Sequence, residues 1–311
     1  MRIATLEPFL TELLMSFGAE GQLCAVSHGC GLDGSLAGRV VVTEPRRAAE
    51  RPTGSQEDEE RLMAGLCSSR AVLSSLVQSQ PDLVLAQVSD PAGEQFVAWA
   101  QGILERKIGK RVALRSFAAT SMMELYAMFE GVAEVVGKGW LGRELAQRTK
   151  AQIQDWTRNF YERARNKRVT VLSSVAPLAL TEGLVADLVR VMTGQPQERS
   201  EGLEARPFGW AEVVQNRSDV VIVAPCGSPL EESVKTLQIL EKLPDWESVP
   251  AVKRGEVVFC EGARFYQPGP HFLRTAAVVI SAMAGLDSGY ITQRDEYFRL
   301  RFLELHRHRF V

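Results

Sequence analysis

The chain has 311 residues, of which 45% are apolar and 24% are charged, and its formal net charge at pH 7 is −2. This length predicts about two domains with hydrophobic cores of ordinary size. The balanced charge makes nucleic acid and anionic membrane surfaces poor partners. Five cysteines are too few for a disulfide scaffold, and their odd number leaves at least one thiol free or paired with another molecule.

The beginning of the chain carries no recognisable targeting segment. No apolar stretch approaches the ~20 residues of a membrane-spanning helix. Residues 1–6 enter a strand-like run directly, without the basic region, long apolar core and small-residue cleavage site of a secretory signal. We therefore expect either a cytoplasmic chain or a mature form that has lost its signal.

Short apolar runs alternate with amphipathic stretches as far as residue 136, a pattern typical of a parallel sheet with helical connections. The expected strands cover residues 2–6, 23–27, 83–86 and 111–114. The first expected helix ends at Gly18, and the later ones cover residues 61–80, 92–106 and 122–136.

Residues 140–165 break this alternation, because they contain no proline and their apolar side chains recur at helical multiples. They predict a single helix roughly 35–40 Å long. Beyond it the alternation resumes, with strands expected at residues 168–172, 220–224 and 257–260 and a closing helix at 272–284.

The two halves of the chain echo each other. Residues 80–86 (Gln-Pro-Asp-Leu-Val-Leu-Ala) and 217–223 (Arg-Ser-Asp-Val-Val-Ile-Val) each lead from a helix into a strand. We therefore predict an α/β fold of two doubly wound, Rossmann-like lobes joined by one long backbone helix. The expected boundaries are 1–139 for the N-terminal lobe, 140–165 for the connecting helix, 166–285 for the C-terminal lobe and 286–311 for a C-terminal tail.

The tail combines basic and apolar side chains between residues 294 and 309. This composition predicts a surface helix that packs an apolar stripe on the body of the protein. The alternative is a segment that binds a partner.

Ligands of open α/β sheets bind beyond the carboxyl ends of the strands, so two facing lobes would form a cleft lined by the loops that follow the strands. The sequence contains no P-loop, no G-x-G-x-x-G turn, no G-x-S-x-G elbow, no H-E-x-x-H helix and no C-x-x-C pair. The lobes therefore lack the usual nucleotide-binding and catalytic fingerprints, and we expect no resident cofactor or metal.

His28 and Cys30 lie two residues apart in the glycine-rich loop after the second expected strand. Such a pair could ligate a soft metal, act as a catalytic Cys–His pair, contact an organic ligand in the cleft wall, or belong to a plain loop. A closed metal site needs about four ligands, and no third one stands nearby in the sequence. We assign His28 to the ligand-binding set.

Residues 265–271 (Phe-Tyr-Gln-Pro-Gly-Pro-His) form an aromatic loop before the last expected helix. Aromatic side chains on a loop stiffened by proline suit a flat, amphipathic ligand, and packing is the alternative. Trp210 stands where a helix of the second lobe begins, and it is the tryptophan that we place near the cleft.

Several short motifs follow one another along the chain. They are Ile-Ala-Thr-Leu-Glu-Pro at 3–8, Val-Ser-His at 26–28, Pro-Asp-Leu-Val-Leu at 81–85, Ala-Pro-Cys-Gly at 224–227, Pro-Ala-Val-Lys-Arg-Gly-Glu-Val at 250–257 and Tyr-Gln-Pro-Gly-Pro at 266–270. In this order and spacing they resemble the cobalamin and iron-siderophore class of ABC-transporter substrate-binding proteins, closest to its cobalamin-binding branch. The resemblance covers roughly residues 2–285. It implies ligand capture in the cleft, delivery to a membrane permease, no catalysis, and a periplasmic or cell-surface location.

The resemblance implies a cobalamin or another corrinoid as the ligand, with a ferric siderophore or a haem-type chelate as the alternative. Siderophore sites gather several Arg or Tyr side chains, whereas the expected rims offer few, mainly Arg115, Arg264 and Tyr266, and this favours the corrinoid. The expected ligand-binding residues are His28, Gln87, Phe117, Trp210, Arg264, Phe265 and Tyr266.

The relatives dock one carboxylate of each lobe onto arginines of the permease. The expected equivalents are Glu94 and Glu182, each at the start of an expected helix, where the helix dipole alone would also favour an acid. We expect a monomer with no nucleic-acid partner. The alternative from another class of function is a cytoplasmic metallo-carrier or an enzyme that uses His28 and Cys30.

Overall fold

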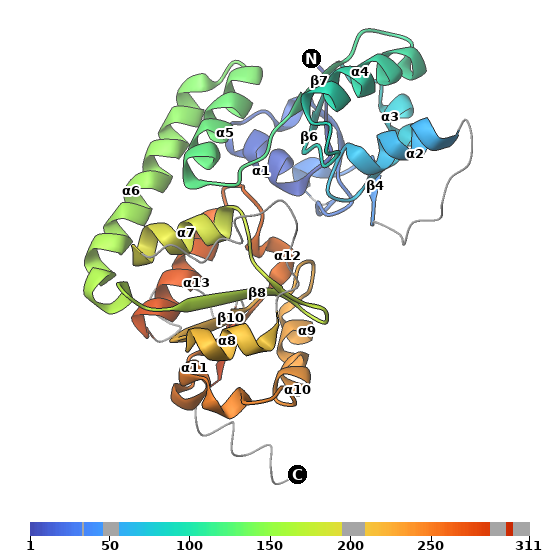
Figure 1. Ribbon diagram of the computed structural model, residues 1–311. Coiled ribbons are helices and arrows are strands. Elements are labelled where there is room, and N and C mark those ends of the chain that lie inside the picture. Colours follow the sequence, from blue (N-terminus) through green and yellow to red (C-terminus); the bar gives the residue numbers. More distant parts are fainter. Residues whose placement is uncertain (33, 46–55, 195–208, 287–296, 301–311) are drawn as a thin grey trace. The chain divides into compact units, whose positions relative to one another are not determined.

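The computed structural model describes residues 1–32, 34–45, 56–194, 209–286 and 297–300 (Figure 1). The chain divides into two compact α/β units. Lobe 1 comprises Met1–Ala118 and Glu124–Ala146, and lobe 2 comprises Ala119–Met123 and Gln147–Val311. The predicted α/β class is confirmed in both.

The sheet of lobe 1 has five parallel strands in the order β3-β2-β1-β6-β7. The strands are β1 (Ile3–Thr5), β2 (Leu23–Val26), β3 (Val40–Val41), β6 (Leu83–Ala86) and β7 (Ala113–Ser116). All three residues of β1 are buried, as expected for the central strand of a sheet covered on both faces. This order is that of a Rossmann-like, doubly wound sheet.

Helices connect or follow these strands, namely α1 (Pro8–Ser16), α3 (Leu73–Ser79), α4 (Glu94–Ile108) and α5 (Met122–Val135). Pro8 begins α1, at a position where the missing N–H costs no helical hydrogen bond. α4 packs against β7 and ends at Gly109, whose positive φ of 80° closes the helix in the left-handed conformation.

The prediction of one continuous helix over residues 61–80 is wrong in its middle. The chain forms α2 (Gln56–Gly65), then the short strand β5 (Arg70–Ala71), and then α3. β5 pairs in antiparallel fashion with β4 (Thr43–Glu44).

Ion pairs and buried apolar side chains explain this break. The guanidinium of Arg70 lies 2.7 Å from carboxylate oxygens of both Glu44 and Glu60, which joins β4 and β5 to α2. Leu62, Leu66 and Leu76 are all fully buried. The apolar spacing of a helix therefore continues across the break and conceals it in the sequence.

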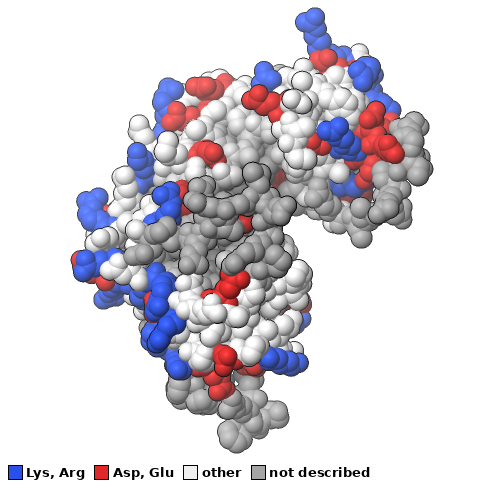
Figure 2. Space-filling view, in the orientation of Figure 1, with Lys and Arg blue, Asp and Glu red and all other residues white. Residues whose placement is uncertain are grey.

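The long helix predicted at residues 140–165 is present as α6 (Gly139–Ala164), which begins in lobe 1 and ends in lobe 2. Its length is roughly 39 Å at the usual helical rise. In lobe 1, α6 passes close to α5 at Gly142, where a Cβ atom would lie 2.6 Å from the backbone oxygen of Phe129. Basic and acidic side chains both lie along α6, with the basic ones more numerous (Figure 2).

The sheet of lobe 2 has the strand order β12-β11-β10-β8-β9. Its parallel centre consists of β8 (Val169–Val175), β10 (Val220–Val223) and β11 (Val257–Cys260), and the antiparallel edges are β9 (Leu178–Leu180) and β12 (Tyr297–Leu300). In Figure 1, α7 (Leu184–Thr193) and α13 (Phe272–Ala284) lie on one side of this sheet, and α8 (Trp210–Asn216) and α11 (Pro250–Arg254) on the other. The shorter helices are α9 (Leu230–Lys235), α10 (Leu237–Leu240) and α12 (Gly262–Phe265).

The prediction of a helix in the tail is wrong at residues 297–300, because these residues form the strand β12. This strand pairs in antiparallel fashion with β11, with Phe298 opposite Phe259. It covers an edge of β11 that would otherwise present unpaired backbone groups. Residues 287–296 and 301–311 of the predicted tail lie outside the described part of the chain.

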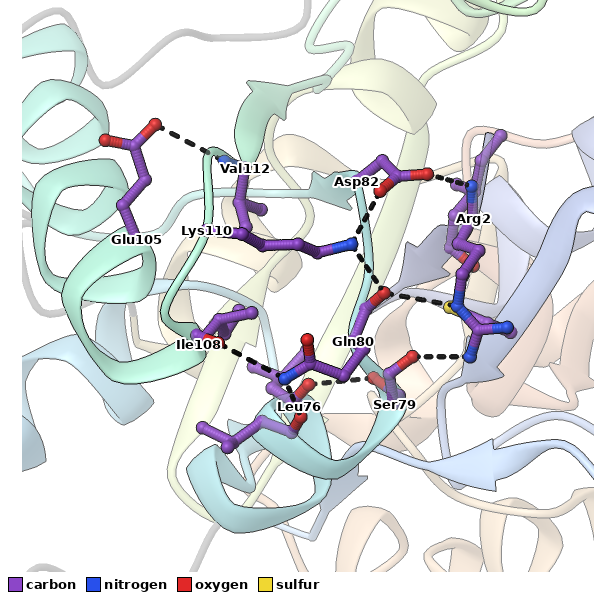
Figure 3. Close-up of polar contacts among 12 residues, drawn as sticks. Arg2, Leu76, Ser79, Gln80, Asp82, Glu105, Ile108, Lys110 and Val112 are labelled. Atoms are coloured by element: carbon purple, nitrogen blue, oxygen red, sulfur yellow. Dashed lines mark hydrogen bonds and ion pairs between the residues drawn. The ribbon is translucent and has the colours of Figure 1, made fainter.

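A polar network closes the amino ends of the strands in lobe 1 (Figure 3). Asp82 accepts a hydrogen bond of 2.7 Å from the backbone N–H of Arg2 and one of 2.6 Å from the ammonium group of Lys110. The guanidinium of Arg2 donates to the carbonyl oxygens of Ser79 at 2.7 Å and Gln80 at 3.2 Å. The network ties together β1, β6 and the segment before β7, and it leaves the carboxyl ends of the strands for another role.

Candidate ligand-binding edges of the two sheets

The carboxyl ends of the parallel strands are the place where open α/β sheets bind ligands. In lobe 1 they lead into the loops after β1, β2, β6 and β7, and in lobe 2 into those after β10 and β11. Of the sequence-predicted ligand residues, His28, Gln87 and Phe117 lie in these loops, and Arg264, Phe265 and Tyr266 lie in α12 and directly after it. Within the described residues, no group of three or more His, Cys, Asp and Glu side chains is placed to hold a metal ion.

Glu7 follows β1 directly, and only 4% of its surface is exposed. Its two carboxylate oxygens accept hydrogen bonds from the backbone N–H of Ser68, at 2.6 Å, and from the Ser68 hydroxyl, at 2.9 Å. Burial raises the pKa of Glu7, and the two Ser68 hydrogen bonds oppose this. Glu7 thereby anchors the segment between α2 and β5 to the carboxyl edge of the sheet. The sequence places Glu7-Pro8 on the expected rim of the cleft, but Glu7 is not among the expected ligand-binding residues.

His28 follows β2, and its ring is held by Thr43. The hydroxyl of Thr43 lies 2.9 Å from the backbone nitrogen of His28 and 2.8 Å from its Nδ1 atom. The His28 residue is nevertheless exposed. Burial lowers the pKa of its imidazole, and the negative charge of Glu44 opposes that effect. The ring is therefore a rigid, largely neutral group at neutral pH.

Cys30 lies in the same loop and donates its thiol hydrogen to the Thr11 hydroxyl at 3.3 Å. Thr11 in turn lies 2.6 Å from the hydroxyl of Thr5. Burial raises the pKa of Cys30, whereas metal ligation and nucleophilic attack both use the thiolate. Burial therefore disfavours the thiolate form of Cys30 in this loop.

Gln87 and Phe117 lie side by side at the ends of β6 and β7. The backbone N–H of Phe117 donates to the carbonyl oxygen of Ala86 at 2.8 Å, which continues the pairing of the two strands beyond their ends. Both residues are half-buried. The Phe117 ring lies against Gly131 of α5, where a Cβ atom would be 3.2 Å from the ring.

In lobe 2, α12 and the residue after it hold three of the predicted ligand residues. Phe265 and Tyr266 form an edge-on aromatic pair with ring centroids 5.2 Å apart, and Phe265 is only 4% exposed. Arg264, by contrast, is exposed. The buried Phe265 ring thus packs against the Tyr266 ring, while Arg264 lies at the surface.

The Tyr266 hydroxyl is already committed within lobe 2. It donates to the carbonyl oxygen of Ala224 at 2.6 Å and accepts from the hydroxyl of Thr181 at 3.3 Å. Burial raises the pKa of Tyr266. Gly262 at the start of α12 lies close to the backbone of Pro225, and only glycine fits there, since a Cβ atom would lie 1.8 Å from the backbone oxygen of Pro225. The hydrogen of the Tyr266 hydroxyl is therefore used within lobe 2.

Trp210 lies in the core of lobe 2, which does not support its predicted place at the ligand-binding face. It is 6% exposed, and its indole N–H donates to the carbonyl oxygen of Pro244 at 2.8 Å. Its ring packs against Trp246 at a centroid distance of 5.3 Å. These contacts pack α8 against the segment after α10.

Glu94 and Glu182 are both exposed, and each lies at the start of a helix. Glu94 is the first residue of α4, after Gly93, and Glu182 precedes Gly183, after which α7 begins. The two glycines have φ values of 53° and 66° with ψ values of −117° and −137°, a conformation that side chains strongly disfavour. The two helices are therefore entered by the same turn.

A shallow pocket of about 370 Å³ lies on lobe 2 between α6 and α7. It is lined by Gln154, Thr157, Arg158, Tyr161 and Val191. None of the predicted site residues belongs to it. The candidate site accordingly rests on the strand ends.

No family model matches the sequence, and no curated protein matches it. Solved structures are similar in fold. A possible iron-binding, periplasmic solute-binding protein of Staphylococcus epidermidis has 16% identity and a TM-score of 0.67, with 90% of this chain and 97% of that chain covered. The periplasmic vitamin B12-binding protein BtuF of Vibrio cholerae has 15% identity and a TM-score of 0.62, with 92% and 98% covered.

A periplasmic heme-binding protein of Pseudomonas aeruginosa is similar over 96% of this chain and 97% of its own, at 13% identity and a TM-score of 0.65. The chain has the two-lobed solute-binding-protein fold. This fold, of two doubly wound lobes joined by one long helix, is the one predicted from the sequence.

None of the described helices of this two-lobed protein combines the length and hydropathy of a membrane-spanning segment.

Proposed function

We propose that this chain is the substrate-binding protein of an ABC transporter. It captures a cobalamin or another corrinoid outside the cytoplasm and delivers it to the membrane permease. The observation that carries the proposal is the pair of Rossmann-like sheets with His28, Gln87 and Phe117 at the strand ends of lobe 1 and Tyr266 at those of lobe 2. Fold neighbours described as a possible iron-binding protein, a vitamin B12-binding protein and a heme-binding protein support it.

The side chains at the strand ends suit binding rather than bond making. The His28 ring is fixed by Thr43, and the Cys30 thiol donates to Thr11. Neither group is set up as a nucleophile, because the activated nucleophiles of enzymes are deprotonated or paired with a base. Reversible capture of a ligand is the function that these groups support.

The choice of a corrinoid rests on the polar groups that remain available. Anionic siderophores and haem propionates are held by several Arg or Tyr side chains. Of the three Arg and Tyr side chains expected on the rims, Tyr266 already donates its hydroxyl hydrogen within lobe 2. Arg115 and Arg264 are exposed and remain available to an anionic ligand. Neutral donors such as the Gln87 amide match the amide-rich periphery of a corrinoid. A haem-type or siderophore chelate is the second candidate, because several fold neighbours bind haem.

Glu94 and Glu182 are the proposed contacts with the permease. Each is exposed at the start of a helix that a glycine of the same unusual conformation introduces. One such carboxylate on each lobe suits a permease that offers basic side chains to both. Exposed charges of this kind act mainly on the rate of association.

Calorimetry and thermal unfolding of the purified chain with cyanocobalamin, haemin and a ferric hydroxamate siderophore test the proposal. We expect cyanocobalamin to bind and, at a hundred times its dissociation constant, to stabilise the protein by ~2.7 kcal/mol. Gln87→Ala should weaken binding about fivefold to tenfold, the cost of one hydrogen bond. The matched control is Gln154→Ala in the pocket on α6.

Each other result has a clear meaning. Binding of haemin or the siderophore without cyanocobalamin selects the second candidate. Failure of all three probes to bind contradicts the proposed function.

A further inference from the structure

A chain of buried hydroxyl groups lies beneath the His28 ring. The hydroxyls of Ser27 and Thr43 are 2.9 Å apart, and these two residues are only 1% and 2% exposed. Thr43 also lies 2.8 Å from Nδ1 of His28 and accepts from the His28 backbone N–H. Ser27 accepts from the backbone N–H of Gly29 at 3.4 Å. These contacts fix the ring on a rigid base at the carboxyl edge of lobe 1.

The number of hydrogens in this chain selects one tautomer of His28. The Ser27 hydroxyl can donate to Thr43, and the Thr43 hydroxyl can then donate to Nδ1 of His28, so that both buried hydrogens are used. In the reverse direction Nδ1–H donates to Thr43 and Thr43 donates to Ser27, which leaves the Ser27 hydrogen without an acceptor among the described residues. A buried hydroxyl without a partner is costly. The first arrangement is therefore the stable one, and it puts the ring hydrogen on Nε2.

We infer that His28 is a specificity-determining residue that donates its Nε2–H to an acceptor oxygen on the ligand, such as a carboxamide or carboxylate oxygen, and does not ligate the metal of a chelate. A histidine that ligates a metal through Nε2 needs a lone pair there and donates from its other nitrogen. The hydroxyl chain imposes the opposite arrangement. Burial also lowers the pKa of His28, so the ring is neutral when it donates. The ligand class in this inference rests on the proposed function.

The tautomer can be observed in the ligand-free protein. Long-range proton–nitrogen NMR spectra of the ¹⁵N-labelled chain at pH 7 should show hydrogen on Nε2 and none on Nδ1, with His28→Gln to assign the signals among the four histidines. Thr43→Val, which keeps the side-chain shape, should allow both tautomers to populate, and Thr43→Ser should preserve one. Hydrogen on Nδ1, a doubly protonated ring at pH 7, or a Thr43→Val spectrum like the wild type would overturn the inference.

Two substitutions of His28 separate donation from ligation. His28→Gln retains an N–H donor at the reach of Nε2 but offers the metal no lone pair there, whereas His28→Ala removes both. With cyanocobalamin or haemin as the probe, His28→Ala should bind about fivefold to tenfold more weakly, and His28→Gln within about threefold of the wild type. The visible spectrum of bound haemin should be the same in all three proteins. Cys30→Ser, which keeps a donor towards Thr11, is the control in the same loop.

The outcomes distinguish this inference from the proposed function. A haemin spectrum that changes equally in both His28 variants means that His28 ligates iron, and unchanged affinity in both means that it does not touch the ligand; either result refutes the inference alone. If the wild type binds neither probe, the proposed function fails and ligand recognition by His28 fails with it. The NMR spectra decide the tautomer in every case.

Discussion

Asp219 makes in lobe 2 the contact that Asp82 makes in lobe 1. Asp82 accepts from the backbone N–H of Arg2, just before β1, at 2.7 Å, and Asp219 accepts from that of Arg168, just before β8, at 3.1 Å. Each aspartate thus ties the start of its own strand to the start of a neighbouring parallel strand. The short sequence echo at residues 80–86 and 217–223 therefore corresponds to a repeated structural device.

The repeat extends to the surroundings of the two aspartates. A basic side chain binds each carboxylate, Lys110 at 2.6 Å in lobe 1 and Arg254 at 2.9 Å in lobe 2. Two residues earlier, Gln80 and Arg217 end the preceding helices in the left-handed conformation, with φ values of 46° and 47°. These features place each aspartate one residue before its strand begins.

Loss of this contact should make the protein less sensitive to acid. Hydrogen bonds from Lys110 and the Arg2 backbone lower the pKa of Asp82, so its contribution to stability is present above the unfolded pKa of ~3.9 and is lost as pH falls through the lower folded value. Asp82→Asn should therefore unfold at lower urea concentration than the wild type at pH 6, and the difference should be smaller at pH 3. The control is Asp155→Asn on α6. A constant difference at both pH values would contradict this account.

The Glu7–Ser68 contact should stabilise lobe 1 most when Glu7 is ionised. Ser68→Ala removes the hydroxyl donor at 2.9 Å from a buried carboxylate, which should lower the free energy of unfolding by about 1.5–3 kcal/mol at pH 7. Urea unfolding measures it, with Ser89→Ala as the control for loss of a serine hydroxyl that donates to backbone oxygens.

The pH dependence of Glu7 has the opposite sign to that of Asp82. Burial raises the pKa of Glu7 in spite of the hydrogen bonds from Ser68, so protonated Glu7 suits the folded protein better than ionised Glu7 does. The contribution of the protonated carboxyl to folding stability is fully present below the unfolded pKa of ~4.3 and is lost as pH rises through the folded pKa. The stability of Glu7→Gln should accordingly fall less than that of the wild type, or rise more, between pH 4 and pH 7. An identical pH profile for the two proteins would show that Glu7 titrates normally.

Trp210 should affect stability and not ligand affinity. Truncation to alanine removes a buried indole and its hydrogen bond to Pro244, which should cost about 3–5 kcal/mol of unfolding free energy. Trp210→Phe should cost less and should bind the ligand as the wild type does, measured by calorimetry at a temperature where the variant is folded. Weaker binding by Trp210→Phe with full stability would return this residue to the ligand-binding set.

The docking role of Glu94 and Glu182 should appear in the kinetics of complex formation. The double substitution Glu94→Lys/Glu182→Lys should retain ligand affinity and slow association with the cognate permease, because rim charges steer the encounter of two proteins. Surface plasmon resonance at low and high salt measures the effect, and Glu162→Lys on α6 is the control. Unchanged association would mean that both residues serve only as helix-start acids.

The sequence by itself determined the elements whose signals are local. The closing helix was predicted at residues 272–284 and α13 has those bounds, while α6 differs from its prediction by one residue at each end. The buried strands β6, β10 and β11 were likewise visible as short apolar runs between turn residues. Helical period, apolar runs and breakers act over a few residues, so one chain segment contains all the information they need.

Only the tertiary structure decided the features that depend on distant partners. β12 requires the free edge of β11, and the segment between α2 and β5 is anchored by Glu7, 61 residues before Ser68. The burial of Trp210 depends on Trp246, and the tautomer of His28 depends on Thr43, 15 residues away and on another strand. A side chain's exposure and its hydrogen-bond partner are properties of the packed fold. The sequence could therefore propose the site residues, but the fold decided which of them are exposed and which are buried.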